Sequence, residues 1–196
     1  MPDGQRIIDP IVFRVPKTLR SQLTEIDVSP ADVDYLGLSH LHIDHLGNIE
    51  LFPDATVLMQ QAEHDAAYGP DAEKLTLIPE TYAALDRDRI QTVVGDHDVF
   101  GDGTVVLTSL PGHTPGHQSL LVHLLDSGPV LLAADIAYSA QDYADAVVPE
   151  SNVDLEQSRY SIETAKRIGR EVGATVWLHH DLDAQRGIRQ APAYYE

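Results

Sequence analysis

The chain has 196 residues, with 13 basic and 31 acidic side chains, so its formal net charge is −18 at pH 7 with histidine neutral. Surfaces that bind nucleic acid or anionic membranes are net basic, so this balance argues against both partners. The absence of cysteine excludes disulfides, thiolate metal ligands and cysteine nucleophiles. Hydrophobic residues make up 43% of the chain, enough for a buried core. We therefore expect a single domain over residues 1–196.

No apolar run is long enough for a transmembrane helix, and residues 1–20 lack the basic-then-apolar pattern of a signal peptide. These two features predict a soluble, cytoplasmic protein.

The apolar periodicity predicts more strands than helices. Residues 1–16 are expected to be irregular, apart from a possible short strand at residues 7–8 or 11–13. Strands are predicted over residues 33–39, 55–60, 89–94, 104–110, 118–125, 130–134 and 175–178, with a hairpin turn at 101–103. Helices are predicted over residues 17–26, 61–68 and 151–172, the last with Ser151 and Asp154 at its cap. This order is typical of a layered α/β domain with mixed β-sheets.

Three histidines and an aspartate follow the predicted strand at 33–39 within six positions: His40, His42, Asp44 and His45. Alternate residues of an extended chain point the same way, so His40 and His42 can share a ligand. Imidazole and carboxylate together suit zinc, iron, manganese or cobalt. A chance cluster of surface histidines is a much weaker explanation for this spacing, so we predict a metal site.

Three later residues also stand where a predicted strand ends. His113 lies in a loop with two glycines and two prolines, Asp135 ends the apolar run 130–134, and His180 follows the strand at 175–178. A buried carboxylate needs a partner charge, which a metal ion supplies. All these side chains can therefore converge on one edge of the domain.

The ordered set of His40, His42, Asp44, His45, His113, Asp135 and His180 resembles the signature of the metallo-β-lactamase superfamily. The resemblance implies an αβ/βα sandwich with two divalent metal ions, zinc above all, at one edge. It places His40, His42 and His113 on one ion and Asp44, His45 and His180 on the other, with Asp135 bridging them.

Within that superfamily, the segments at 111–121 and 128–132 are similar to those of the N-acyl homoserine lactonases, which act in quorum quenching. In these lactonases a tyrosine three residues after the bridging aspartate reaches the substrate carbonyl, and Tyr138 occupies that position. The resemblance implies that a metal-bridging hydroxide opens the lactone ring. Tyr138 would polarise the carbonyl, and Asp44 would pass a proton to the leaving oxygen.

The resemblance is incomplete at the N-terminal side. The family usually begins with strands that carry an Asp-x-Gly segment, and no such segment precedes His40 here. The N-terminal strands are therefore expected to be shortened, and a second copy in a homodimer could cover the exposed sheet edge.

Other activities share these ligands. A glyoxalase-II-like thioesterase or a phosphotriesterase remains an alternative, and Tyr138 is the residue that favours a lactonase. The acidic net charge argues against a nuclease. His42 argues against a di-iron redox protein, in which a glutamate is typical at this position. The intact ligand set argues against a non-catalytic relative. Among the other histidines, His117 is expected to orient a ligand, whereas His179 is expected to point away from the site.

Overall fold

The computed structural model describes residues 5–8 and 11–196, with side chains described from Val15 onward. The irregular structure expected for residues 1–4 and 9–10 lies outside these residues. The strands β1 (Gln5–Ile8) and β2 (Ile11–Arg14) pair in antiparallel fashion, so both apolar stretches near the N-terminus are strands.

Two further sheets organise the described part of the chain. One contains β3 (Tyr35–Gly37), β4 (Thr56–Gln60) and β5 (Ile90–Val93) in the order β3-β4-β5, all parallel. The other has the order β10-β9-β8-β7-β6, from β6 (His97–Asp98), β7 (Val105–Ser109), β8 (Gln118–Leu124), β9 (Gly128–Ala134) and β10 (Thr175–Leu178). Only β10 and β9 pair in parallel there, so this second sheet is mixed.

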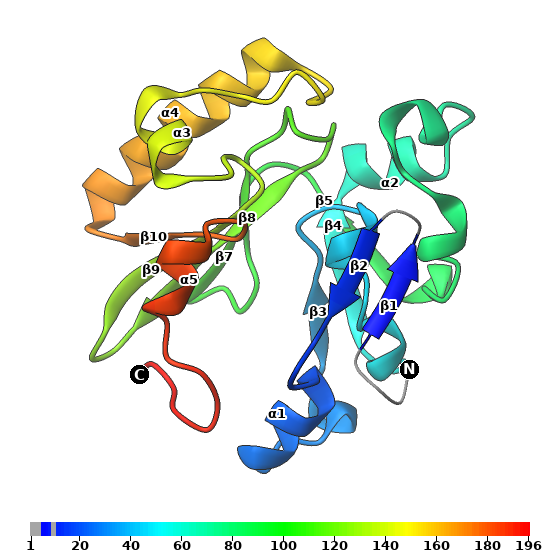
Figure 1. Ribbon diagram of the computed structural model, residues 1–196, viewed down its shortest axis with the longest axis vertical. Coiled ribbons are helices and arrows are strands. Elements are labelled where there is room, and N and C mark those ends of the chain that lie inside the picture. Colours follow the sequence, from blue (N-terminus) through cyan, green and yellow to red (C-terminus); the bar gives the residue numbers. More distant parts are fainter. Residues whose placement is uncertain (1–4, 9–10) are drawn as a thin grey trace.

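Helices cover the outer faces of these two sheets (Figure 1). The helices are α1 (Leu19–Glu25), α2 (Gln61–Ala67), α3 (Ala140–Asp145), α4 (Leu155–Val172) and α5 (Leu182–Arg186). Leu131 and Ala133 of β9 pack against Ile162 and Ala165 of α4 in one buried cluster. Leu58 of β4 packs with Leu107 of β7, so apolar contacts also join the two sheets. This layering agrees with the predicted α/β sandwich.

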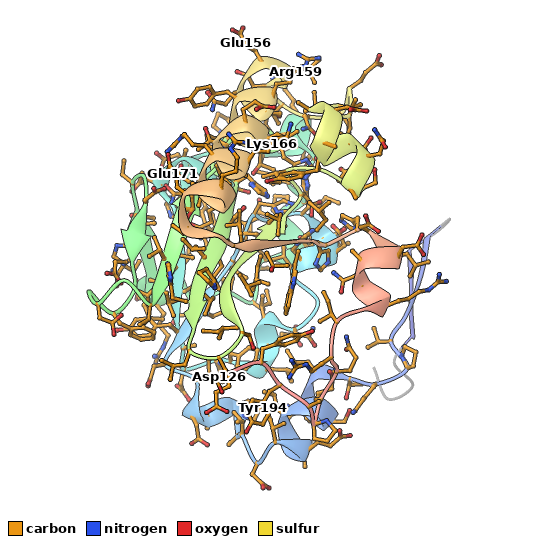
Figure 2. The ribbon with its side chains drawn as sticks, turned by 90° about the vertical axis from the view of Figure 1, so that its left-hand side faces the viewer. Asp126, Glu156, Arg159, Lys166, Glu171 and Tyr194 are labelled. Atoms are coloured by element: carbon orange, nitrogen blue, oxygen red, sulfur yellow. The ribbon has the colours of Figure 1, made fainter. Side chains whose placement is uncertain are left out.

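The sequence explains where the long helix α4 begins and where it ends. Asp154 accepts a hydrogen bond from the backbone of Gln157, and Gly173 ends the helix at a φ of +71°, where glycine is favoured. The labels Glu156, Arg159, Lys166 and Glu171 mark the course of α4 in Figure 2. The prediction placed the start at Ser151, which is wrong because the side chain of Asp154 provides the cap.

The strand β3 lies at the edge of its sheet, because β4 is the neighbour with which it pairs among the described residues. Tyr35 on this strand is 45% exposed. Among the helices that the structure describes, none combines the length and apolar character needed to cross a membrane.

Candidate metal centre

Four strand ends converge at one edge of the sandwich, as the sequence predicts. His40 follows β3, and a short 3-10 turn over Ile43–His45 carries the rest of the first cluster. His113 lies in the loop between β7 and β8, Asp135 directly follows β9, and His180 lies just beyond β10. The fold therefore brings all seven sequence-predicted ligands together, although they are spread over residues 40–180.

The side chains form two groups that could each hold a metal ion. Ligand atoms of His40, His42 and His113 lie within 4.8 Å of one another. The atoms of Asp44, His45, Asp135 and His180 meet the same limit. The first group consists of the three histidines that the family resemblance assigns to one ion, and the second contains the three residues assigned to the other ion together with Asp135.

Asp135 lies between the two groups. Its Oδ2 atom is 3.1 Å from Nε2 of His180 and 3.5 Å from Nε2 of His113, while its Oδ1 atom is 3.3 Å from Nε2 of His45. The residue is only 3% exposed, so few waters can screen its charge. One carboxylate thus faces imidazoles of both groups, which is the geometry that a bridging ligand requires.

The electrostatics of the centre keep the Asp135 carboxylate charged and favour neutral rings at His40 and His113, whereas the hydrogen bond to Asp135 raises the pKa of His180. Burial alone would raise the pKa of Asp135, but the imidazoles of His180 and His45 hold that pKa well below its usual range. Burial lowers the pKa of His40 and His113, and neighbouring imidazoles act in the same direction. Neutral imidazole and ionised carboxylate are the forms that bind metal ions.

Buried atoms without hydrogen-bond partners show that these residues fit a cation. Nε2 of His40, Nε2 of His45 and Oδ1 of Asp135 are buried and make no hydrogen bond. Unpaired buried polar atoms are rare because each costs the free energy of its lost hydration. Metal-binding atoms are buried without hydrogen-bond donors when no ion is present, because their lone pairs are directed at the position of the ion.

Neighbouring polar groups set the orientation of the imidazoles. The hydroxyl of Ser39 lies 3.2 Å from Nδ1 of His40 and 3.3 Å from Nδ1 of His45, so the Nε2 atoms of both rings face Asp135. Nδ1 of His113 lies 3.0 Å from the side-chain oxygen of Asn152. Such contacts fix the ring orientation of metal-binding histidines in other proteins.

The sequence analysis missed Ser39 and Asn152. Ser39 directly precedes the histidine cluster, so its position in the sequence was a usable signal. Asn152 lies in the turn before α4 and gave no signal, because its contact with His113 spans 39 residues.

His117 has the orienting position that the sequence predicts. Its ring is completely buried between two backbone groups, the carbonyl of Leu110 at 2.9 Å and the N–H of Asp135 at 3.1 Å. Burial lowers its pKa to about 3, so the ring is neutral. The Nδ1–H group donates to Leu110, and Nε2 accepts from Asp135.

The expectation for His179 is wrong. Its ring centroid lies 4.9 Å from those of His45 and His180, and the three imidazoles form a further group with ligand atoms within 4.8 Å of one another. The alternation of a strand does not continue to this residue, because β10 ends at Leu178 after a register shift. His179 therefore lies beside the centre instead of pointing away.

Tyr138 lies beside the centre. Its ring centroid is 5.2 Å from that of His180 and 6.2 Å from that of His113, in edge-to-face arrangements. Burial, together with the charges of Asp135 and Asp44, raises the pKa of its hydroxyl. Tyr138 therefore stays protonated at neutral pH and can donate a hydrogen bond near both groups.

A two-sheet sandwich covered by helices, with a histidine- and aspartate-rich centre at one edge, defines a class of metal-dependent hydrolases. A family model described as the metallo-beta-lactamase superfamily matches residues 4–172. The chain belongs to this superfamily, and the family together with the side-chain groups indicates binding of divalent metal.

Curated relatives narrow the comparison to one branch. The chain is 35% identical over 193 residues to N-acyl homoserine lactonase AttM of Azorhizobium caulinodans, covering 94% of this chain and 72% of that protein. It is 30% identical over 173 residues to N-acyl homoserine lactonase AiiA of Bacillus thuringiensis subsp. kurstaki, covering 88% of this chain and 65% of the relative. These matches confirm the resemblance inferred from the sequence.

Solved structures give the same picture. An N-acyl homoserine lactone hydrolase with N-hexanoyl-L-homoserine, its product, at the catalytic metal centre superimposes with a TM-score of 0.80. That match has 28% identity and covers 95% of this chain and 71% of the other chain. A Bacillus thuringiensis AiiA variant with bound N-decanoyl-L-homoserine gives the same TM-score, identity and coverage. The fold thus matches that of lactone hydrolases.

Proposed function

We propose that this chain is a metal-dependent hydrolase that opens the ring of N-acyl homoserine lactones. The observation that carries the proposal is the position of Tyr138 beside both side-chain groups, 5.2 Å from His180 between ring centroids. Support also comes from relatives that are N-acyl homoserine lactonases at up to 35% identity.

In this proposal the centre binds two divalent ions, with zinc as the first candidate and iron, manganese or cobalt as alternatives. His40, His42 and His113 would hold one ion, Asp44, His45 and His180 the other, and Asp135 would contact both. Mixed imidazole and carboxylate ligands suit zinc, and also iron, manganese and cobalt. When bound, the ions supply Lewis acidity at the lactone carbonyl and activate a water molecule as nucleophile.

Two residues of the chain act on the substrate in this proposal. The protonated hydroxyl of Tyr138 donates a hydrogen bond to the carbonyl oxygen, where negative charge develops in the transition state. Asp44 is one-third exposed and 3.5 Å from Nε2 of His180, so it lies between solvent and the centre. From there its carboxylate would take a proton from the attacking water and pass it to the ring oxygen as the ester C–O bond breaks.

The neutral lactone also suits the charge of the protein. A glutathione thioester is anionic and calls for free cations near the site. Lys166, a cation of α4, instead donates to the carbonyl of Ala144 at 2.9 Å and to Glu163 at 2.6 Å. Lys166 is therefore not free to meet an anionic substrate.

We also propose that residues 1–196 act as one domain, and that a second copy of the chain covers the free edge of β3. Among the described residues β3 pairs only with β4, and such an edge with an exposed tyrosine is a pairing hazard that a homodimer would remove.

A substrate panel on metal-loaded protein tests the proposed activity. The panel contains acyl homoserine lactones of several chain lengths, simple lactones, S-lactoylglutathione and paraoxon. We expect kcat/KM to be highest for acyl homoserine lactones. A preference of orders of magnitude for S-lactoylglutathione or paraoxon would contradict the proposal and support a thioesterase or a phosphotriesterase.

A further inference from the structure

The carboxylate of Glu63 is completely buried, yet it is not part of the proposed metal centre. Glu63 lies in the first turn of α2 and is 0% exposed. Its Oε1 atom accepts a hydrogen bond from the backbone nitrogen of Leu41 at 2.9 Å. Its Oε2 atom accepts from the hydroxyl of Thr114 at 2.6 Å and from the backbone nitrogen of Gly116 at 3.0 Å. Both oxygens are therefore paired with protein donors.

These donors belong to the two segments that present the three-histidine group. Leu41 lies between His40 and His42, and Thr114 directly follows His113. One side chain thus connects segments more than 70 residues apart in the sequence, and these segments supply every imidazole of the group. The contacts are made to backbone and hydroxyl groups next to the histidines, so Glu63 sets the positions of their backbones.

The loop that carries His113 packs closely against the start of α2. A Cβ atom at Gly116 would lie 2.2 Å from the backbone nitrogen of Glu63, so the histidine loop packs directly on the start of α2. The other end of α2 is held in the core, where Tyr82 donates its hydroxyl hydrogen to the carbonyl of Ala67 at 2.7 Å. The helix therefore provides a fixed support for both segments.

Burial of the Glu63 carboxylate is unfavourable, because the charged group loses its hydration. Moving a charge out of water costs several kcal/mol, and good hydrogen bonds offset only part of this cost. Burial raises the pKa of Glu63, while the Thr114, Leu41 and Gly116 donors act in the opposite direction. An apolar side chain at this position would leave the two backbone N–H groups unpaired and the two loops unconnected.

We propose that Glu63 is a positioning residue that holds the His40–His42 segment and the His113 loop at the spacing needed to bind a divalent ion. This inference rests on the metal site in the proposed function. Glu63 does not contact the ion or the substrate. It acts because a ligand set that is already ordered loses less conformational freedom when the ion binds.

The test is metal affinity measured without substrate. In Glu63→Gln, the side-chain amide cannot accept the hydrogen bonds that one oxygen accepts in the native protein. We expect binding of cobalt(II) or zinc(II), measured by chelator competition, to weaken by about ten- to a hundredfold, as for other changes behind metal ligands. The visible absorption spectrum of the cobalt(II) protein should also change, because the three-histidine geometry relaxes. Thr114→Val removes one of the hydrogen bonds and should weaken binding in the same direction by a smaller factor.

Tyr82→Phe is the matched control, because it removes a buried hydrogen bond to the same helix without touching the histidine segments. It should lower the thermal midpoint and weaken metal affinity far less than Glu63→Gln does, because the hydrogen bonds from Glu63 to both histidine segments remain. If Glu63→Gln does not fold, Thr114→Val carries the test. Native-like affinity and spectrum in the folded variant, or equal weakening in Tyr82→Phe, would overturn the role of Glu63. Failure of the wild type to bind metal would instead overturn the proposed function itself.

Discussion

The ring of His117 accepts a hydrogen bond from the backbone nitrogen of Asp135 over 3.1 Å, while its other nitrogen lies 2.9 Å from the carbonyl oxygen of Leu110. A neutral imidazole is the only state of histidine that can donate on one side and accept on the other. Burial lowers the pKa of His117 and so favours this state. The backbone before the central carboxylate is thereby tied to the strand that leads to His113.

The first prediction concerns this link. His117→Leu leaves a buried donor and a buried acceptor without partners, which costs about 1–3 kcal/mol each. We expect a corresponding loss of unfolding free energy in urea, measured on chelator-treated protein, and a lower metal content in the untreated protein. His123→Leu, on an exposed position of β8, serves as the control. Equal stability of the two variants would mean that the His117 contacts contribute nothing.

The second prediction concerns metal removal. If the ions join four strand ends, they stabilise the folded state by mass action, because the unfolded chain does not present the ligand set. We expect about two transition-metal ions per chain by elemental analysis. Treatment with a chelator should abolish lactone hydrolysis and lower the thermal midpoint, and added zinc should restore both. Full activity in protein shown to be metal-free would rule out the metal-dependent mechanism.

The third prediction concerns Asp135, which faces imidazoles of both groups. In Asp135→Ala the carboxylate that would contact both proposed ions is lost, so two cations bound there would repel each other without compensation. We expect metal content and activity to fall together, with less than two ions per chain. Retention of two ions and normal turnover would show that Asp135 is not the bridge.

The fourth prediction concerns Tyr143, whose hydroxyl is buried without a hydrogen-bond partner. Burial raises its pKa to about 12. The charge of Arg170 lowers this pKa, and the charge of Glu163 raises it. The unfolded chain ionises this tyrosine first, so its contribution to stability is complete below about pH 10 and is lost as the pH rises towards 12. Tyr143→Phe should be at least as stable as the wild type at neutral pH and should lose less stability between pH 9 and about 11. Urea unfolding at several pH values measures this, and an identical alkaline slope would contradict it.

The positions of His113, Asp135 and His180 could be predicted because each of them lies at or soon after the end of an apolar strand. The apolar run before Asp135 and the loop around His113 show this in the sequence, and parallel and antiparallel strands that share a sheet bring their ends to common edges. The apolar stretch predicted at 175–178 is β10 as the structure has it, whereas the strand predicted at 33–39 is shorter, as β3, and β6 was not predicted.

Other features depend on contacts that the sequence does not display. Glu63 looks like an ordinary residue of a short helix, and only the fold brings it to Leu41 and Gly116. The helices α3 and α5 have six and five residues, too few for a periodic apolar pattern to be visible. Both begin with a side chain that caps the backbone, Ser139 in one and Asp181 in the other, so local capping was the usable signal.

The last prediction separates a lactonase from a thioesterase and concerns Tyr138. Its pKa is raised by burial and by Asp135 and Asp44, so the hydroxyl is a hydrogen-bond donor at neutral pH. Tyr138→Phe keeps the ring packed against His180 and removes only that donor. Loss of one donor to a developing oxyanion costs roughly 1.5–4 kcal/mol, or about ten- to a thousandfold in rate. We expect this loss in kcat/KM for acyl homoserine lactones while the metal content stays unchanged, because Tyr138 lies outside both ligand groups.

Tyr160→Phe, on an exposed position of α4, is the matched control and should behave as the wild type. Unchanged lactone hydrolysis in Tyr138→Phe would show that this tyrosine only packs at the edge of the centre, and the thioesterase would then be the better assignment.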